Sequence, residues 1–118
     1  MDESRLMRSM LLDFYGELLT SKQRECYDLH YNDDLSLAEI AEQLGISRQG
    51  VWDNIRRADA ALRDIEEKTG LIRRFSNTQQ SLERLHGQMQ RLTQLCTGEA
   101  GDIAAAAAAE VEKMRLEV

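Results

Sequence analysis

Proline is absent from this sequence and aromatic residues are scarce. None of its 118 residues is proline, and Phe, Trp and Tyr together account for 5% of them. Turn-rich β domains normally carry several prolines, whereas helices need none, so the composition favours an all-α fold. No stretch of about 18 apolar residues occurs, and the first residues lack the basic and apolar regions of a secretory signal. We therefore expect a cytoplasmic protein with no membrane partner.

Residues that could carry catalysis or bind a metal are few and scattered. Cys26 and Cys96 lie far apart, a pattern typical of reduced thiols in a cytoplasmic protein. His30 and His86 fall in separate predicted helices, with no cysteine or carboxylate at the spacing of metal ligands. The sequence has no glycine-rich phosphate-binding loop and no pattern of a Ser, His and Asp triad. We expect no enzymatic activity, no catalytic residue, no metal and no cofactor.

The chain is acidic, and its charge is spread evenly. The formal net charge is −6, and each of the segments 1–19, 20–75 and 76–118 contributes −2 of it. Phosphate contacts by basic residues supply most non-specific affinity for nucleic acid. The charge therefore excludes broad, charge-driven nucleic-acid binding. Any binding of DNA or RNA has to use a small local patch.

The spacing of apolar and capping residues predicts a chain of helices without strands. Capping boxes, in which a hydroxyl residue is followed three positions later by Gln or Glu, start helices at Thr20 and at Ser36. Gly45 and Gly70 fall where helices end, because a helix often closes on a left-handed residue. We expect turns at 32–34 and 98–101, and helices over about residues 4–19, 21–31, 36–44, 47–69, 76–97 and 102–118.

Residues 36–57 predict a helix-turn-helix. Two helices that cross steeply need a small residue at the crossing, which Ala41 supplies, and a residue of positive φ in the turn, which Gly45 supplies. Ser47 caps the second helix, with its N-terminus turned outward towards a groove. The apolar wedge between the helices consists of Ile40, Leu44, Ile46, Val51 and Ile55. Other small helical bundles also contain capped helices joined at a glycine, but here every element falls at the required offset.

The second helix of this motif carries the candidate nucleic-acid-binding residues, which are Arg48, Gln49, Trp52, Asp53, Arg56 and Arg57. Glutamine can read adenine and arginine can read guanine or bind phosphate, so Gln49 and Arg56 are candidate base contacts. Arg48 and Arg57 would hold the phosphate backbone. Asp53 repels phosphate, so we expect it to accept from cytosine or to pair with an arginine one turn away. Trp52 either meets the ligand or packs sideways on the first helix or on a second subunit.

Residues 76–118 predict a helical hairpin that extends the motif domain of residues 1–75. Its first helix carries a heptad seam of Leu82, Leu85, Met89, Leu92 and Cys96, and its second contains six consecutive alanines over 104–109. The hairpin either closes on itself or also meets another subunit. Because helix-turn-helix dimers bind two half-sites, we expect a homodimer in which this extension serves oligomerisation.

The motif sequence resembles known families. Residues 19–65 resemble region 4 of sigma factors, and residues 5–75 are similar to the YlxM family of helix-turn-helix proteins. This resemblance implies a winged-helix-like, all-α domain. The family pattern usually has alanine in place of Gly50 and tyrosine in place of Trp52, which affects base preference more than fold. The matching runs lie at residues 12–15, 18–20, 22–25, 31–34, 38–41 and 47–55.

Members of the YlxM family are associated with the signal recognition particle. The resemblance implies a bacterial cytoplasmic protein whose gene neighbours the signal-recognition-particle GTPase, with a regulatory role in that protein-targeting pathway. We expect a DNA-binding regulatory protein that takes part in this pathway. One alternative is a protein- or RNA-binding adaptor that modulates the GTPase without sequence-specific DNA binding, and another is a structural module that binds only protein. DNA, the particle's RNA and its GTPase remain open as partners.

Overall fold

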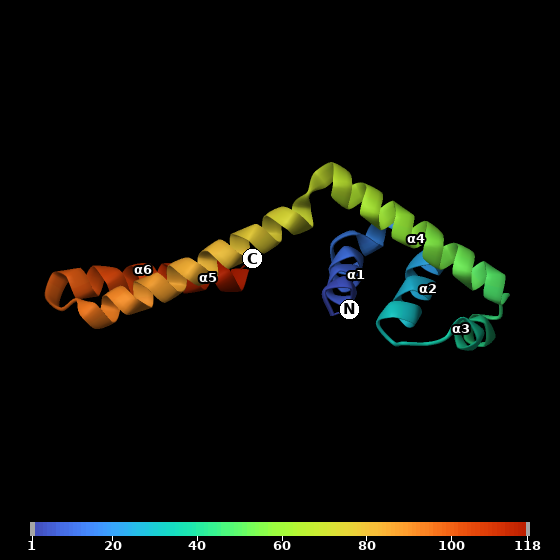
Figure 1. Ribbon diagram of the computed structural model, residues 1–118, viewed down its shortest axis with the longest axis horizontal. Helices are drawn as coiled ribbons and strands as arrows, with labels where there is room; N and C mark the ends of the chain where they lie inside the picture. The colour runs from blue at the N-terminus through green and yellow to red at the C-terminus, as the bar shows by residue number, and fades with distance from the viewer. Residues whose placement is uncertain (1, 118) are drawn as a thin grey trace. The chain divides into compact units, whose positions relative to one another are not determined.

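The computed structural model describes residues 2–117, and every regular element among them is helical. The absence of strands in this range confirms the predicted all-α class and leaves no β-wing beside the motif. No helix of the described chain is long and apolar enough to cross a membrane. In chain order (Figure 1), the elements are α1 (Asp2–Tyr15), the 3-10 turn η1 (Gly16–Leu18), α2 (Ser21–Tyr31), α3 (Leu37–Leu44), α4 (Arg48–Thr69), α5 (Leu71–Leu95) and α6 (Gly98–Glu117).

Helix α2 begins at its predicted cap, whereas α1 runs from Asp2 and ends earlier than predicted. At the start of α2, the Thr20 hydroxyl accepts from the Gln23 amide at 3.1 Å and the Gln23 side chain accepts from the Thr20 amide at 3.2 Å. Helix α1 stops at Tyr15, not at residue 19, because the chain tightens into the 3-10 turn. Gly16 is buried there, and an added Cβ would lie 3.2 Å from Leu12 Cδ1. Glycine therefore allows this close turn.

The first compact unit, which ends at Ile72, has a core in two parts joined by α4. One cluster contains Leu11, Leu12, Tyr15, Tyr27, Ala58, Leu62 and Ile72, and the other contains Cys26, Ile40, Val51 and Ile55. The predicted stripe of α4 is thus buried from Val51 to Leu62. Ile65 is only partly buried, at the edge of the first cluster.

Helix α5 begins at Leu71, five residues before the predicted start at residue 76. Gly70 closes α4 with φ of +63°, as expected, but no linker follows it. The last turn of α4 caps the new helix instead, because the Glu66 carboxylate accepts from the Ile72 amide at 3.0 Å. A second compact unit starts at Arg73, so the predicted boundary between residues 75 and 76 falls inside α5.

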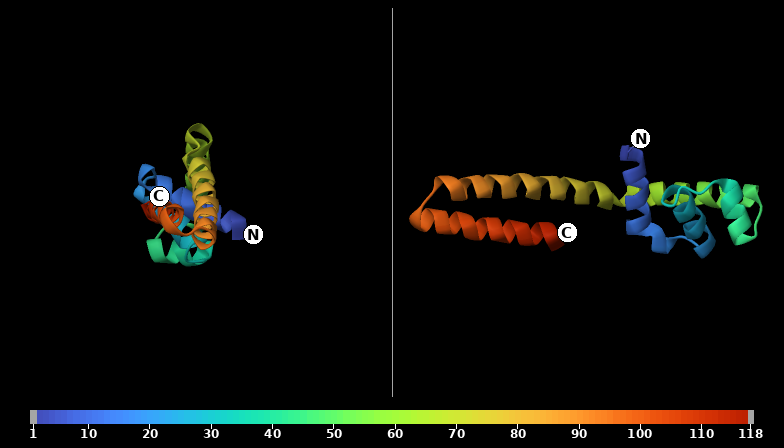
Figure 2. Two further views of the ribbon diagram at one scale, coloured as in Figure 1. Left: turned by 90° about the vertical axis from the view of Figure 1, so that its left-hand side faces the viewer. Right: turned by 90° about the horizontal axis from the view of Figure 1, so that it is seen from below.

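Helices α5 and α6 form an antiparallel hairpin (Figure 2), and α6 begins at Gly98, not at the predicted cap Asp102. The expected turn at 98–101 is its first helical turn. Gly101 makes this possible, because an added Cβ would lie only 2.8 Å from the Cys96 carbonyl oxygen. The predicted heptad seam divides in two. Leu82 is only 5% exposed, whereas Leu85 and Leu92 are each 42% exposed.

Candidate nucleic-acid interface

Helices α3 and α4 form the predicted helix-turn-helix. The Ser36 hydroxyl accepts from the Glu39 amide at 3.1 Å, and the Glu39 carboxylate accepts from the Ser36 amide at the same distance. These hydrogen bonds to Ser36 lower the pKa of Glu39, so its carboxylate stays charged near the positive end of the helix. Gly45 ends α3 with φ of +69°, and its amide donates to the Ala41 carbonyl at 2.9 Å. The predicted cap and turn glycine are confirmed, and Ala41 packs against the core cluster that contains Ile40 and Val51.

The angle between α3 and α4 is held by the second core cluster. Ile40, Val51 and Ile55 are buried there, and Leu44 and Ile46 pack against them, so the predicted wedge is confirmed. Cys26 of α2 is fully buried beneath the same wedge. Burial raises the pKa of its thiol, which therefore acts as an apolar packing group. The motif rests on α2 as a rigid platform.

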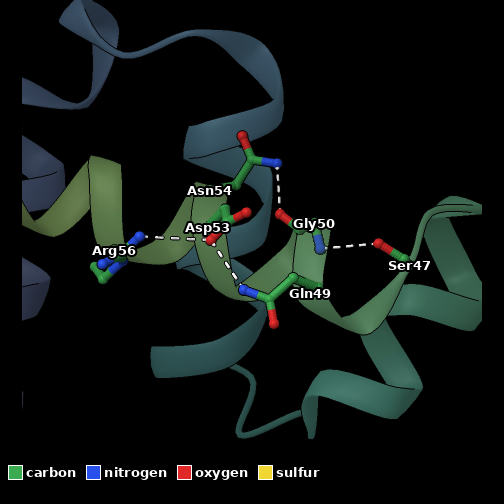
Figure 3. Close-up of polar contacts among 6 residues, drawn as sticks. All are labelled: Ser47, Gln49, Gly50, Asp53, Asn54 and Arg56. Carbon is green, nitrogen blue, oxygen red and sulfur yellow. Dashed lines mark hydrogen bonds and ion pairs between the residues drawn. The ribbon is translucent and has the colours of Figure 1, made fainter.

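The first turn of α4 is fixed by two hydrogen bonds to Gly50 (Figure 3). The Ser47 hydroxyl accepts from the Gly50 amide at 2.9 Å, and the Asn54 side-chain amide donates to the Gly50 carbonyl at 2.9 Å. The role of Asn54 was missed in the sequence analysis. The only sequence signal for this contact is that Asn54 follows Gly50, the third residue of α4, by four positions, which is one helical turn.

Asp53 joins two of the candidate binding residues into one polar chain (Figure 3). Its Oδ1 atom accepts from Gln49 Nε2 at 3.1 Å and lies 3.6 Å from an Arg56 guanidinium nitrogen. The expected pairing of Asp53 with an arginine one turn away is thus confirmed for Arg56. This contact takes one N–H of Gln49 and leaves its second N–H and its carbonyl oxygen for a base.

Trp52 lines an open hollow of about 320 Å³ together with Leu37, Arg48 and Gln49. Trp52 is 41% exposed, and the hollow is mainly apolar because Trp52 and Leu37 line it. Leu37 is the first residue of α3. Trp52 therefore shares this surface with α3. Leu37 was not among the predicted site residues, since its place in the sequence indicated only a helix start.

The six predicted residues form two overlapping groups and one outlier. Arg48, Gln49 and Trp52 surround the hollow, while Gln49, Asp53 and Arg56 form the polar chain. Arg57 is exposed but lies further around α4 and belongs to neither group. The face can thus offer an aromatic surface, amide hydrogen bonds and guanidinium groups to one ligand.

Comparison with known proteins places the whole motif in one family. Residues 2–99 match the family described as "Putative helix-turn-helix protein, YlxM / p13 like". The match extends past residue 75, where the resemblance seen in the sequence ended, to the start of α6. The second unit is therefore partly a family feature, which the sequence analysis had not recognised.

Several relatives are about half identical to this chain over the segments that align. A UPF0122 protein of Geobacillus kaustophilus is 50% identical over 89 residues, which are 75% of this chain and 81% of the relative. One from Thermoanaerobacter sp. (strain X514) is 47% identical over 85 residues, or 72% of this chain and 73% of the relative. One from Acetivibrio thermocellus is 60% identical over 67 residues, or 57% of each chain.

Proposed function

Because the chain belongs to the YlxM / p13-like family of helix-turn-helix proteins, we propose that it is a regulatory protein that binds nucleic acid through the exposed face of α4. The observation that carries this proposal is the position of Arg48, Gln49 and Arg56. Gln49 and Arg56 lie opposite the buried stripe of α4, Arg48 is exposed in its first turn, and none of the three belongs to the core. An α-helix presented in this way fits the major groove of duplex DNA.

The local electrostatics favour a phosphate at the start of α4, although the chain as a whole is acidic. Arg48 is the first residue of the helix, where unpaired amides and the helix dipole attract anions. Arg57 adds a second exposed guanidinium. Asp53 opposes phosphate, but its contacts with Gln49 and Arg56 offset part of its charge. We expect modest affinity that depends on these few contacts.

The resemblance to the YlxM family suggests that the ligand belongs to the signal-recognition-particle pathway. A specific observation favours its RNA as a second candidate. Trp52 is exposed beside Arg48 in an apolar hollow, and unpaired RNA bases stack on such aromatic surfaces while arginine holds the adjoining phosphate. Duplex DNA has no unpaired base to fill this hollow.

The test is a titration of the full chain against three labelled ligands at low salt: a pool of random duplex DNA, the particle's RNA and its GTPase. The double variant Arg48→Ala with Arg56→Ala should lose on the order of 2–5 kcal/mol of binding to the nucleic acid that is bound. Binding should also weaken as salt rises, with a shallower salt dependence in the variant.

The matched control is the double variant Lys22→Ala with Lys68→Ala, which also removes two positive charges. Lys22 is exposed on α2, and Lys68 is exposed near the end of α4. It should retain nearly all of the affinity. Circular dichroism should show the native helix content in both variants. Equal losses in both would mean that net charge, and not the α4 face, determines binding. Binding of the GTPase alone, unaffected by either variant, would replace the proposal with a protein adaptor.

A further inference from the structure

The second compact unit has little apolar core of its own. Of the buried apolar residues in the described chain, all except Leu82 and Ala104 lie in the first unit. Larger apolar side chains of the hairpin stay in solvent: Leu85 and Leu92 are each 42% exposed and Met114 is 45% exposed. Two helices alone bury too little surface to be firmly stable, and helical hairpins normally complete a bundle.

On α5, the exposed leucines lie to one side of the face that meets α6. His86 faces α6, because its Nε2 atom lies 3.1 Å from the Glu112 carboxylate. Leu85 immediately precedes His86, so its side chain is rotated by about 100° around the helix. Leu92 follows seven residues later, at nearly the same angle. These leucines form a second apolar stripe along α5.

On α6, Ile103 and Met114 form the corresponding stripe. Each immediately precedes a residue that faces α5, namely the buried Ala104 and Arg115, which lies 3.3 Å from His86. Their side chains are therefore rotated by about 100° in the same sense as Leu85. Because α5 and α6 are antiparallel (Figure 2), equal rotations in the same sense bring both stripes to the same side of the hairpin.

This apolar face has a positive edge on α5 and a negative edge on α6. Helix α5 carries four arginines against one glutamate, a net +3, whereas α6 carries five acidic residues against two basic ones, a net −3. Arg84 and Arg91 directly precede Leu85 and Leu92, on the side of α5 that faces away from α6, while Glu99 and Glu110 border the stripe of α6. Within the described part of the chain none of these four makes an ion pair, and Arg84 bonds only to the Ser81 hydroxyl.

We propose that the α5–α6 hairpin docks face to face with the hairpin of a second copy of this chain, and that the two complete a four-helix bundle. A two-fold axis parallel to the helices sets each α5 against the partner's α6. This arrangement keeps neighbouring helices antiparallel and brings Arg84 and Arg91 towards the acidic edge of the partner. The other two-fold arrangement sets α5 against α5 and brings like charges together.

The first experiment measures the mass of the full chain by light scattering across a range of concentrations. We expect twice the 13.5 kDa of one chain. Met114→Asp places a charge on the shared face and should raise the dimer dissociation constant at least tenfold. Leu116→Asp is the matched control, because Leu116 is 79% exposed and lies on another side of α6. A mass of one chain at high micromolar concentration, or equal effects of the two variants, would overturn the proposal.

The second experiment tests the pairing with charges that do not touch the core. Arg84→Glu with Arg91→Glu should raise the dissociation constant roughly tenfold, and so should Glu99→Arg with Glu110→Arg. All four changes in one chain should restore the dimer, because each reversed edge again meets an opposite one. If the variant with all four substitutions dissociates as readily as the two double variants, α5 does not pair with the partner's α6. Circular dichroism of each variant separates loss of pairing from loss of folding.

Discussion

Tyr15 and Tyr27 are both buried in the same core cluster, but their hydroxyl groups differ in what they contact. The Tyr15 hydroxyl donates to the Glu66 carboxylate at 2.7 Å and lies 2.7 Å from the Thr69 hydroxyl. The Tyr27 hydroxyl has no hydrogen-bond partner among the described residues. A buried polar group that is paired stabilises a fold, whereas an unpaired one lowers its stability.

Replacing these tyrosines by phenylalanine should therefore have different effects. Tyr15→Phe should lower the free energy of unfolding by about 1–2 kcal/mol, because it removes a partner of Glu66 at the end of α4. Tyr27→Phe keeps the ring, which packs 4.8 Å from that of Tyr31, and should change stability by less than about 0.5 kcal/mol or increase it. Urea unfolding of both variants checks this, and equal losses would contradict it.

The same two tyrosines predict a loss of stability in alkaline solution. Burial raises the pKa of both hydroxyls, and the hydrogen bond to Glu66 raises that of Tyr15 further. The folded chain keeps these protons at a pH where unfolded tyrosine, with a pKa of about 10, releases them. Stability should thus be constant below about pH 10 on this account and fall above it. Thermal unfolding across this range measures the fall, which should be smaller in Tyr27→Phe.

Two glycines of the helix-turn-helix differ in what an added side chain would meet, which is an unfavourable backbone conformation at Gly45 and a close neighbour at Gly50. Gly45 has φ of +69° with nothing within 4 Å of an added Cβ, so only its backbone conformation requires glycine. Gly50 lies within the helix, where an added Cβ would be 3.1 Å from the Ser47 hydroxyl oxygen. A shift of a few tenths of an ångström in that flexible cap would relieve the contact.

Alanine should therefore act in opposite directions at the two positions. Gly45→Ala should destabilise the chain by about 1 kcal/mol, since a residue with a Cβ resists positive φ. Gly50→Ala should stabilise it by somewhat less than 1 kcal/mol, because alanine favours the helix but the cap has to move. Denaturant midpoints compare the two variants with the unmodified chain. Destabilisation by Gly50→Ala would show that the Ser47 cap cannot adjust.

At the scale of the whole molecule, the core clusters of the motif close at Ile72, which is buried beside Leu62. A chain truncated after Phe75 should therefore keep its helices and unfold cooperatively. Truncation after Gly70 removes Ile72 and should cost a further 2–5 kcal/mol or so. Circular dichroism during heating distinguishes the two fragments.

The fragment that ends at Phe75 should also be monomeric, because it lacks the hairpin face. A dimeric fragment would move the proposed interface to the first unit.

The helix-turn-helix could be predicted from the order of the residues alone, because the features that specify it are local. Capping boxes, the turn glycine at position 45 and the stripe from Val51 to Leu62 depend on residues a few positions apart, and backbone geometry fixes their consequences. The same periodicity placed Gln49 and Arg56 on the exposed side of α4, with Arg48 beside them in the first turn. The pairing of Asp53 with Arg56 was also predictable, since both lie on one helix.

Features that depend on packing between distant segments could not be predicted in this way. Helix α5 begins at Leu71 because Glu66 caps it, and no composition rule anticipates a cap formed by the preceding helix. The heptad spacing could not show that Leu82 is buried while Leu85 and Leu92 stay exposed, because the width of a seam is set by the partner helix. The hollow that joins Trp52 to Leu37 likewise exists only once α3 has crossed α4, since the residues that line it come from two helices.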